Sequence, residues 1–324
     1  MARRRSIDEQ VRAIQGLRDV PDSPEVRTAL ADGLASKHSV LTAAAAQVIA
    51  RTELQGLEEQ LVAAFERLMH EPVKRDKGCF AKTAIADALY RLECDQDALF
   101  LRGIRHTQFE PVYGGREDTA ATLRGTSALA LVRCHHPGVM LELARLLSDP
   151  QATARVAAAD AIAYTLDEGA GAPLLRFKIL TGDADVRVTA ACFGALLRLS
   201  REQAISFVAE CALDQDHEAR EAAVLALGEA RLKDALAPLS AIAEEPASGE
   251  LAQVAHLAIA MLRNDAAWDY LVETIEDASE PRARAAIEAL SHYRHDSSLH
   301  TRVMAATAAR ADPQLEAFAA ARFA

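Results

Sequence analysis

The chain has 324 residues, a formal net charge of −11 and a sequence pI near 5.4. This acidic balance opposes nucleic-acid binding over the whole surface, because phosphates require a basic footprint. Half of the residues are apolar but only 5% are aromatic, as expected for Ala- and Leu-rich helices that pack closely together. The chain is too long for one ordinary globular core, yet no Gly-, Ser- or Pro-rich linker divides it.

The cysteines and the N-terminal residues bear on the cellular compartment. There are five cysteines, an odd number, and none forms a C-x-x-C pair. This usage is typical of buried, reduced thiols in a cytosolic protein. The basic start MARRRSIDEQ has no apolar stretch behind it, so we expect neither a secretory signal nor a membrane span. We therefore expect a soluble, cytoplasmic protein.

The first part of the chain is predicted to form a leading helix and three helical pairs. The leading helix is expected over 6–17, with Ser6 as N-cap and Glu9 completing a capping box. Apolar spacing then predicts helices over 24–36, 39–51, 54–71, 79–93, 96–106 and 119–134. The third pair contains about ten surplus residues, which we place in a loop insert at 106–118.

A marker position recurs along the chain with a nearly constant period. From Lys82 the steps are 42, 31, 32, 33, 32, 32 and 32 residues, and Thr42 is the earlier equivalent. Three residues after each marker stands a mostly small residue and seven after it a mostly bulky one, such as Ala223 and Leu227 after Arg220. This spacing defines one face of a helix, and a fixed period near 32 indicates a repeat array. The marker residues are Lys82, Arg124, Arg155, Arg187, Arg220, Ala252, Arg284 and Glu316.

The pattern Asp-x-x-x-Arg-x-x-Ala-x-x-x-Leu, seen in DADVRVTAACFGALL and DQDHEAREAAVLALG, resembles the HEAT repeat. The short unit is similar to the HEAT-like type of the phycobilisome lyases, and the likeness is clearest over 137–292. The resemblance implies a polar ladder in which turn aspartates pair with the Arg that follows. It assigns this structural role to Arg155, Asp185, Arg187, Asp216 and Arg220.

We therefore predict an all-α fold, an α-α superhelix of about nine HEAT-like helical hairpins. Residues 1–324 are expected to form a single solenoid. Its predicted parts are an N-terminal cap helix (1–22), irregular repeats with the insert (23–136), regular repeats (137–295) and a C-terminal capping repeat (296–324).

The insert is the predicted binding site. It contains aromatic, Gly and Arg residues, which make contact surfaces in proteins. Residues 74–133 have ten Lys and Arg against eight Asp and Glu, whereas the remainder has 26 against 39. This local balance favours an acidic protein segment or a phosphate-bearing group as partner. The predicted binding residues are Lys82, Arg102, Arg105, His106, Phe109, Tyr113, Arg116 and Arg124.

Two classes of function remain open from the sequence. The first is a non-enzymatic scaffold that mediates protein–protein interaction, for which we expect no catalytic residue, cofactor or metal. The second is an enzyme or enzyme subunit, lyase-like or metal-dependent, with its site beneath the 106–118 insert. The sequence contains neither a P-loop nor a G-x-S-x-G motif, and no histidine spacing matches a complete set of metal ligands. A deep pocket beneath the insert would favour chemistry, and a broad surface would favour binding.

Overall fold

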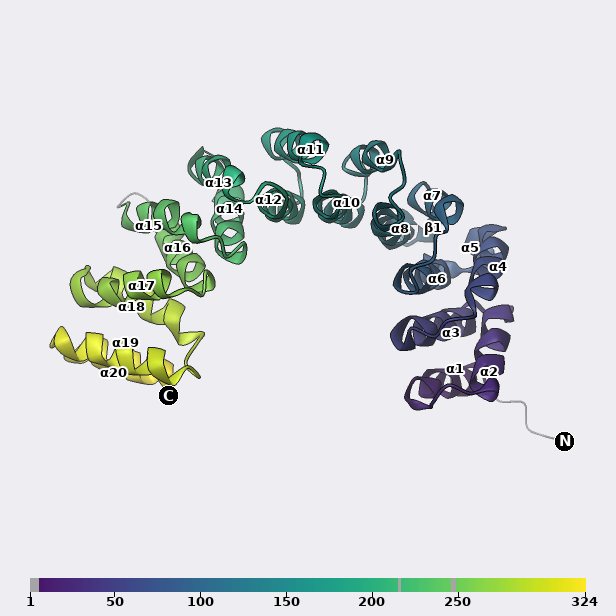
Figure 1. Cartoon of the computed structure of the whole chain (residues 1–324), viewed down its shortest axis with the longest axis horizontal. Helices are drawn as coiled ribbons and strands as arrows, with labels where there is room; N and C mark the ends of the chain where they lie inside the picture. Colours follow the sequence, from purple (N-terminus) through teal and green to yellow (C-terminus); the bar gives the residue numbers. More distant parts are fainter. Residues whose placement is uncertain (1–5, 215–216, 246–248) are drawn as a thin grey trace. The chain divides into compact units, whose positions relative to one another are not determined.

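The computed structural model describes residues 6–214, 217–245 and 249–324. Within these residues the fold is helical, with twenty α-helices and a single pair of short strands (Figure 1). The predicted all-α fold of paired helices is confirmed. The helices fall into two compact units, Met1–Thr165 and Leu166–Ala324.

The first unit consists of helices α1 to α10, with a β-hairpin between α7 and α8. Its α-helices are α1 (Ile7–Gly16), α2 (Pro24–Ala35), α3 (Ser39–Thr52), α4 (Glu58–Met69), α5 (Pro72–Arg75), α6 (Phe80–Arg91), α7 (Asp97–Ile104), α8 (Ala121–Arg133), α9 (Val139–Leu146) and α10 (Ala152–Tyr164). Its remaining elements are the 3-10 turns η1 (Leu17–Asp19) and η2 (Lys77–Cys79) and the strands β1 (Phe109–Val112) and β2 (Gly115–Asp118).

The second unit consists of helices α11 to α20. They are α11 (Glu168–Thr181), α12 (Val186–Ser200), α13 (Glu202–Asp214), α14 (His217–Glu229), α15 (Leu236–Glu244), α16 (Glu250–Met261), α17 (Asp265–Asp277), α18 (Glu280–Ser291), α19 (Ser297–Ala309) and α20 (Pro313–Phe323), with the 3-10 turn η3 (Lys233–Ala235). None of the described helices combines the length and apolar character that crossing a bilayer requires.

Short polar side chains cap the N-termini of several helices. Ser6 accepts the Glu9 N–H and Glu9 accepts the Ser6 N–H, which confirms the predicted capping box. Asp185 caps α12 and Asp312 caps α20, and the latter is followed by a proline in the first helical turn. Each cap satisfies backbone N–H groups that have no partner inside the helix.

Each unit is a stack of antiparallel helical pairs in which the second helices pack on one another. In the first unit α3, α6, α8 and α10 pack consecutively, and in the second unit α12, α14, α16, α18 and α20 do the same. The faces in contact are those that the marker register predicts. Ala223 and Leu227 of α14 are fully buried, as are Ala255 and Ile259 of α16.

Two features depart from the expected pattern. The insert is not an irregular loop, because its residues form the β1–β2 hairpin. The connection after α4 contains α5, η2 and the buried Asp76. Asp76 is buried because it accepts the backbone N–H groups of Ala81 and Lys82 at the start of α6.

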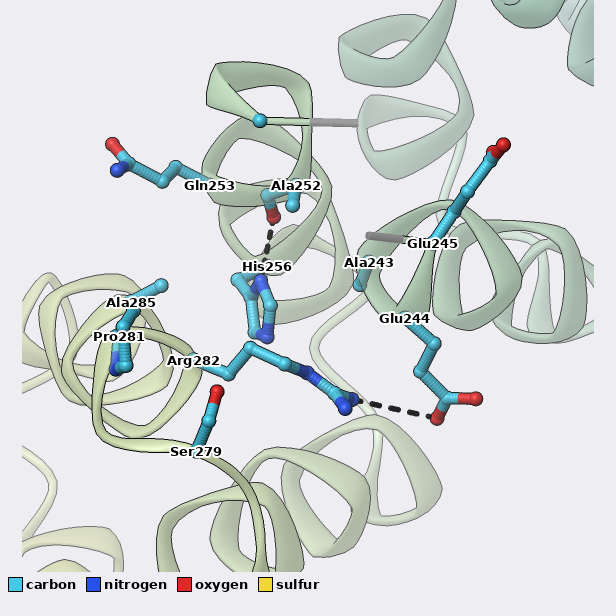
Figure 2. Close-up of a pocket in the computed structure, with 11 residues that line it drawn as sticks. Ala243, Glu244, Glu245, Ala252, Gln253, His256, Ser279, Pro281, Arg282 and Ala285 are labelled. Carbon is cyan, nitrogen blue, oxygen red and sulfur yellow. Dashed lines mark hydrogen bonds and ion pairs between the residues drawn. The ribbon is translucent and has the colours of Figure 1, made fainter. Parts of the chain in front are cut away.

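The second unit also contains a cavity of about 390 Å³ (Figure 2). Residues of α15, α16 and α18 line it, with His256 from α16 and Arg282 from α18 among them.

Two glycines test the stacking of the second helices. A Cβ at Gly228 would lie 2.6 Å from the carbonyl oxygen of Ala258, whereas a Cβ at Gly194 would have no atom within 4 Å. Gly228→Ala should therefore destabilise the second unit, because the α16 backbone must move away from α14. Gly194→Ala should stabilise it by about 0.5–1 kcal/mol through the helix preference of Ala. Urea unfolding followed by circular dichroism measures both changes, and a stabilised Gly228→Ala variant would contradict the packing described.

Candidate functional site

The surplus residues of the third pair form an antiparallel hairpin that projects from the first unit. Phe109 pairs with Asp118 at its base, and Val112 pairs with Gly115 next to the two-residue turn. Gly114 in that turn has φ +89, a conformation that favours glycine. Tyr113 occupies the other turn position and is fully exposed, at 108%. The hairpin therefore carries an aromatic side chain at its tip.

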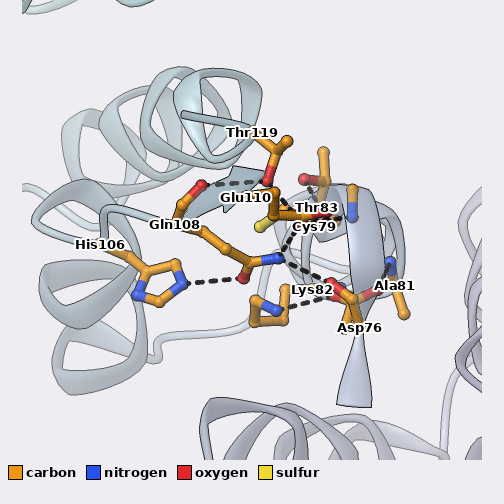
Figure 3. A network of polar contacts seen from close by, with 10 residues as sticks. Asp76, Cys79, Ala81, Lys82, Thr83, His106, Gln108, Glu110 and Thr119 are labelled. Atoms are coloured by element: carbon orange, nitrogen blue, oxygen red, sulfur yellow. Dashed lines mark hydrogen bonds and ion pairs between the residues drawn. The ribbon is translucent and has the colours of Figure 1, made fainter. Parts of the chain in front are cut away.

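The base of the hairpin is held by a buried polar network (Figure 3). The Glu110 carboxylate accepts hydrogen bonds from the Gly78 N–H at 2.6 Å and the Gln108 side-chain amide at 2.7 Å. It also accepts one from the Thr119 hydroxyl at 2.9 Å. Burial disfavours the charged form of Glu110, but these three donors outweigh burial, and the pKa of the carboxyl is lowered. The hairpin is thus bonded to the turn before α6.

A buried ion pair lies directly beneath this contact. Lys82 Nζ is 2.9 Å from Asp76 Oδ2, and the two side chains are 0% and 1% exposed. Gln108 donates its amide to the Asp76 carbonyl at 2.8 Å, which connects the pair to the hairpin. Such a pair contributes only when every charge is satisfied, since an isolated buried ion is strongly destabilising.

A second buried pair connects the hairpin to the following repeat. Arg124 contacts Asp118 at the end of β2 at 2.8 Å and Asp149, after α9, at 2.7 Å. It also donates to the His106 carbonyl at 2.9 Å. Burial opposes ionisation of Asp118, yet the Gln108 and Ala120 N–H groups and Arg124 lower the pKa of its carboxyl. Arg124 therefore joins the hairpin, its own helix and the next turn.

The structure separates the eight predicted binding residues into three groups. Lys82 and Arg124 are buried in ion pairs, so they hold the interior together and are not presented at the surface. The exposed group is Phe109, Tyr113 and Arg116.

The second group is engaged at or near the surface. Arg102 pairs with Glu66 of α4, and Arg105 pairs with Glu142 of α9. These pairs bridge α7 to its neighbouring first helices, so the charges that predicted an anionic partner are largely neutralised. His106 is half-buried, its ring contacts the Gln108 side chain at 3.3 Å, and burial lowers the pKa of its imidazole.

The predicted ladder residues bond mainly to the turns of their own repeats. Arg187 pairs with Asp185 at 2.6 Å, as expected, and this pair is exposed. Arg155 donates to the Asp149 carbonyl at 2.7 Å, and Arg220 donates to the Ala212 carbonyl at 2.7 Å. Asp216 lies outside the described residues.

The eight predicted binding residues do not include four residues of the hairpin region. Asp76, Gln108 and Glu110 form its polar base, and Phe80, 72% exposed, lies beside it because its ring covers Gly78. A signal was present for Asp76, since an aspartate stands six residues before the marker in several repeats. These aspartates are Asp76, Asp118, Asp149 and Asp214, which precede Lys82, Arg124, Arg155 and Arg220.

The stacked antiparallel helical pairs define an α-helical repeat protein. Residues 173–260 match the family described as HEAT repeats, so this segment of the chain is similar to HEAT repeats. No protein among the curated sequences matches it. Among solved structures it is similar to the complex of CpcE and CpcF of phycocyanin lyase from Nostoc sp. PCC7120. That likeness has a TM-score of 0.40 and 18% identity, and covers 79% of this chain and 96% of the other.

The buried Asp76–Lys82 pair predicts that substitution of Lys82 lowers the unfolding free energy much more than substitution of Arg102. Lys82→Met leaves the Asp76 carboxylate buried without its cation, so it should cost about 3–5 kcal/mol of unfolding free energy. Arg102→Met removes a half-exposed pair and should cost about 0–1 kcal/mol. Urea unfolding followed by circular dichroism measures both losses, and equal losses would show that Asp76 and Lys82 are not a buried pair.

Acid should release the hairpin. The pKa values of Asp118 and Glu110 lie below their ordinary values of 3.8 and 4.5. Carboxyls whose pKa is lowered by folding stabilise the folded state above the unfolded pKa and lose this effect as the pH falls through the folded pKa. Hydrogen exchange at the Gln108 and Thr119 amides, corrected for intrinsic rate, should therefore accelerate below about pH 4.

Two comparisons control this pH experiment. Amides of α3, a helix without carboxylates, should show no comparable acceleration. Asp118→Asn should reduce the pH dependence because the residue no longer titrates. Parallel acceleration in α3 and in the hairpin would instead indicate global unfolding and contradict a local effect.

Proposed function

We propose that this chain is a non-enzymatic scaffold that binds a partner protein through the β1–β2 hairpin of the first unit. The observation that carries the proposal is a fully exposed Tyr113 at the tip of a hairpin whose base is bonded into the core. Exposed aromatic side chains on a fixed support lose little conformational entropy on binding. A hairpin that served only to lengthen a connection would need neither feature.

The apolar side chains around the hairpin support the same conclusion. Phe109 is 55% exposed and Phe80 lies beside the base. Val112, next to the turn, is also exposed. Aromatic and aliphatic groups gathered at one place on a soluble protein are typical of a contact surface.

The charge near the hairpin favours an acidic segment or a phosphate-bearing group on the partner. Among the described residues, Lys77 and Arg116 are exposed cations without an ion-pair partner. Lys77 precedes Gly78, which donates to Glu110, so it flanks the hairpin. Arg116 is on β2 opposite Pro111. These two charges are fewer than the sequence balance implied, and they would orient the partner more than they would hold it.

The rival function, an enzyme with a site beneath the insert, has less support. Gln108, Glu110 and Asp118 fill the space beneath the hairpin, and their polar atoms bond to one another and to the backbone. A reactive centre needs groups that are free to meet a substrate. The arrangement resembles a support more than a catalytic pocket.

Photo-crosslinking tests the proposed contact. A p-benzoylphenylalanine at position 113 should crosslink a defined partner in cells, and the same amino acid at position 177 should not. Phe177 is a suitable control because it is 68% exposed and belongs to α11 of the second unit. The band should weaken with Arg116→Ala and as NaCl increases, because exposed charges are screened. An identical partner pattern at positions 113 and 177 would contradict the proposal.

A matched pair of variants separates binding from stability. The double variant Tyr113→Ala, Arg116→Ala should lose capture of that partner with an unchanged melting temperature, because both side chains lie outside the core. Arg105→Ala should retain capture, since Arg105 is paired with Glu142. Loss of capture in Arg105→Ala but not in the double variant would place the contact on α7 and overturn the assignment to the hairpin.

A further inference from the structure

The cavity of the second unit has a polar end and apolar walls (Figure 2). Ala243, Ala252, Pro281 and Ala285 contribute the apolar walls. His256 reaches into the cavity from α16, and Arg282 crosses beside it from α18. A volume of about 390 Å³ lies within the range of small-molecule sites. The described residues therefore provide both space and a polar end.

His256 presents an unused hydrogen-bond acceptor to this cavity. The residue is 0% exposed, and its Nδ1 is 2.5 Å from the Ala252 carbonyl oxygen. A carbonyl only accepts, so Nδ1 carries the proton and Nε2 has a lone pair. Burial lowers the pKa of the imidazole, which keeps the ring neutral. Nε2 has no hydrogen-bond partner among the described residues.

Arg282 presents an unused donor next to this acceptor. Its Nε is buried and has no partner among the described residues. Its Nη2 is 3.6 Å from Glu244 and 3.4 Å from the Tyr270 hydroxyl, while that hydroxyl donates to Glu244 at 3.1 Å. Glu244 therefore balances the positive charge of Arg282 through Nη2 and does not bond to the Nε–H group. Unpaired buried groups of this kind are rare in folded proteins.

We propose that this cavity binds a small, mainly apolar ligand through a neutral group that both donates and accepts a hydrogen bond. A hydroxyl or a carboxamide fulfils this condition. Its O–H or N–H donates a hydrogen bond to His256 Nε2, and its oxygen accepts one from Arg282 Nε–H. The Ala and Pro walls contact the apolar part of the ligand. The site lies in the second unit, and it is independent of the hairpin and of the partner proposed for it.

Charged ligands fit the same groups less well. A carboxylate would place negative charge against the His256 lone pair. An ammonium group would meet Arg282, whose cation is already balanced by Glu244. Each mismatch leaves one buried polar atom unsatisfied, and this costs about tenfold or more in affinity.

A series of four small probes, which form two isosteric pairs, tests this chemistry. The probes are 1-butanol, butyramide, butyrate and butylammonium, each titrated into the ¹⁵N-labelled full chain. The ¹⁵N resonance of His256 Nε2, assigned by its absence from His256→Leu, reports directly on the acceptor. Butanol and butyramide should shift it in a saturable manner, whereas butyrate and butylammonium should require at least about tenfold higher concentrations.

A cavity-filling variant provides the control. Ala285→Leu places a larger side chain in the wall and should abolish the shift, and Ala285→Val should weaken it if the leucine variant does not fold. No saturable shift with any probe would mean that the cavity holds only water, and this would overturn the proposal. Equal affinities for all four probes, or a shift that persists in the filled variants, would also overturn it.

Discussion

The contact between a marker residue and the end of the preceding helix or turn, made in several repeats, is the interaction on which the stack depends. The last carbonyl groups of a helix have no partner within that helix. Thr42 donates to the Gly33 carbonyl, Arg155 to the Asp149 carbonyl and Arg220 to the Ala212 carbonyl. In these three repeats the marker position at the start of the second helix therefore satisfies a carbonyl group of the preceding helix or turn. This fixes how the two helices of a pair meet, so small residues can then bring successive second helices together.

At the hairpin the marker residues bond to carboxylates and not only to backbone carbonyl groups. Lys82 and Arg124 occupy the marker position on either side of it, and both bond to a carboxylate six residues earlier. Gln108 donates to the Asp76 carbonyl and Asp118 pairs with Arg124, so the hairpin is attached at both ends. The insertion is thus joined to the repeats through polar groups that the repeats already contain. A rigid, aromatic-tipped projection on an otherwise repetitive scaffold follows from this arrangement.

The two candidate sites differ in what the sequence could reveal about them. Tyr113 and Arg116 were predictable because the insert interrupts a regular period and contains residue types that make contacts. His256 and Arg282 gave no such signal, since each lies in an ordinary repeat helix and looks like a packing or solvated residue. Only the fold places an unbonded imidazole nitrogen and an unbonded guanidinium N–H in one cavity. Burial and missing partners are properties of the environment and not of the residue.

The sequence by itself determined the helical repeats, their register and most helix boundaries. These features depend on residues within about one turn of each other, such as the Ser6 and Glu9 box or the spacing of Ala223 and Leu227. Tertiary structure alone decided which charges are paired and which are left unpaired. Arg102 and Glu66 are 36 residues apart and Arg105 and Glu142 are 37 apart, yet each pair meets across stacked helices. A count of charges along the chain cannot register such pairs, because the attraction depends on distance in space.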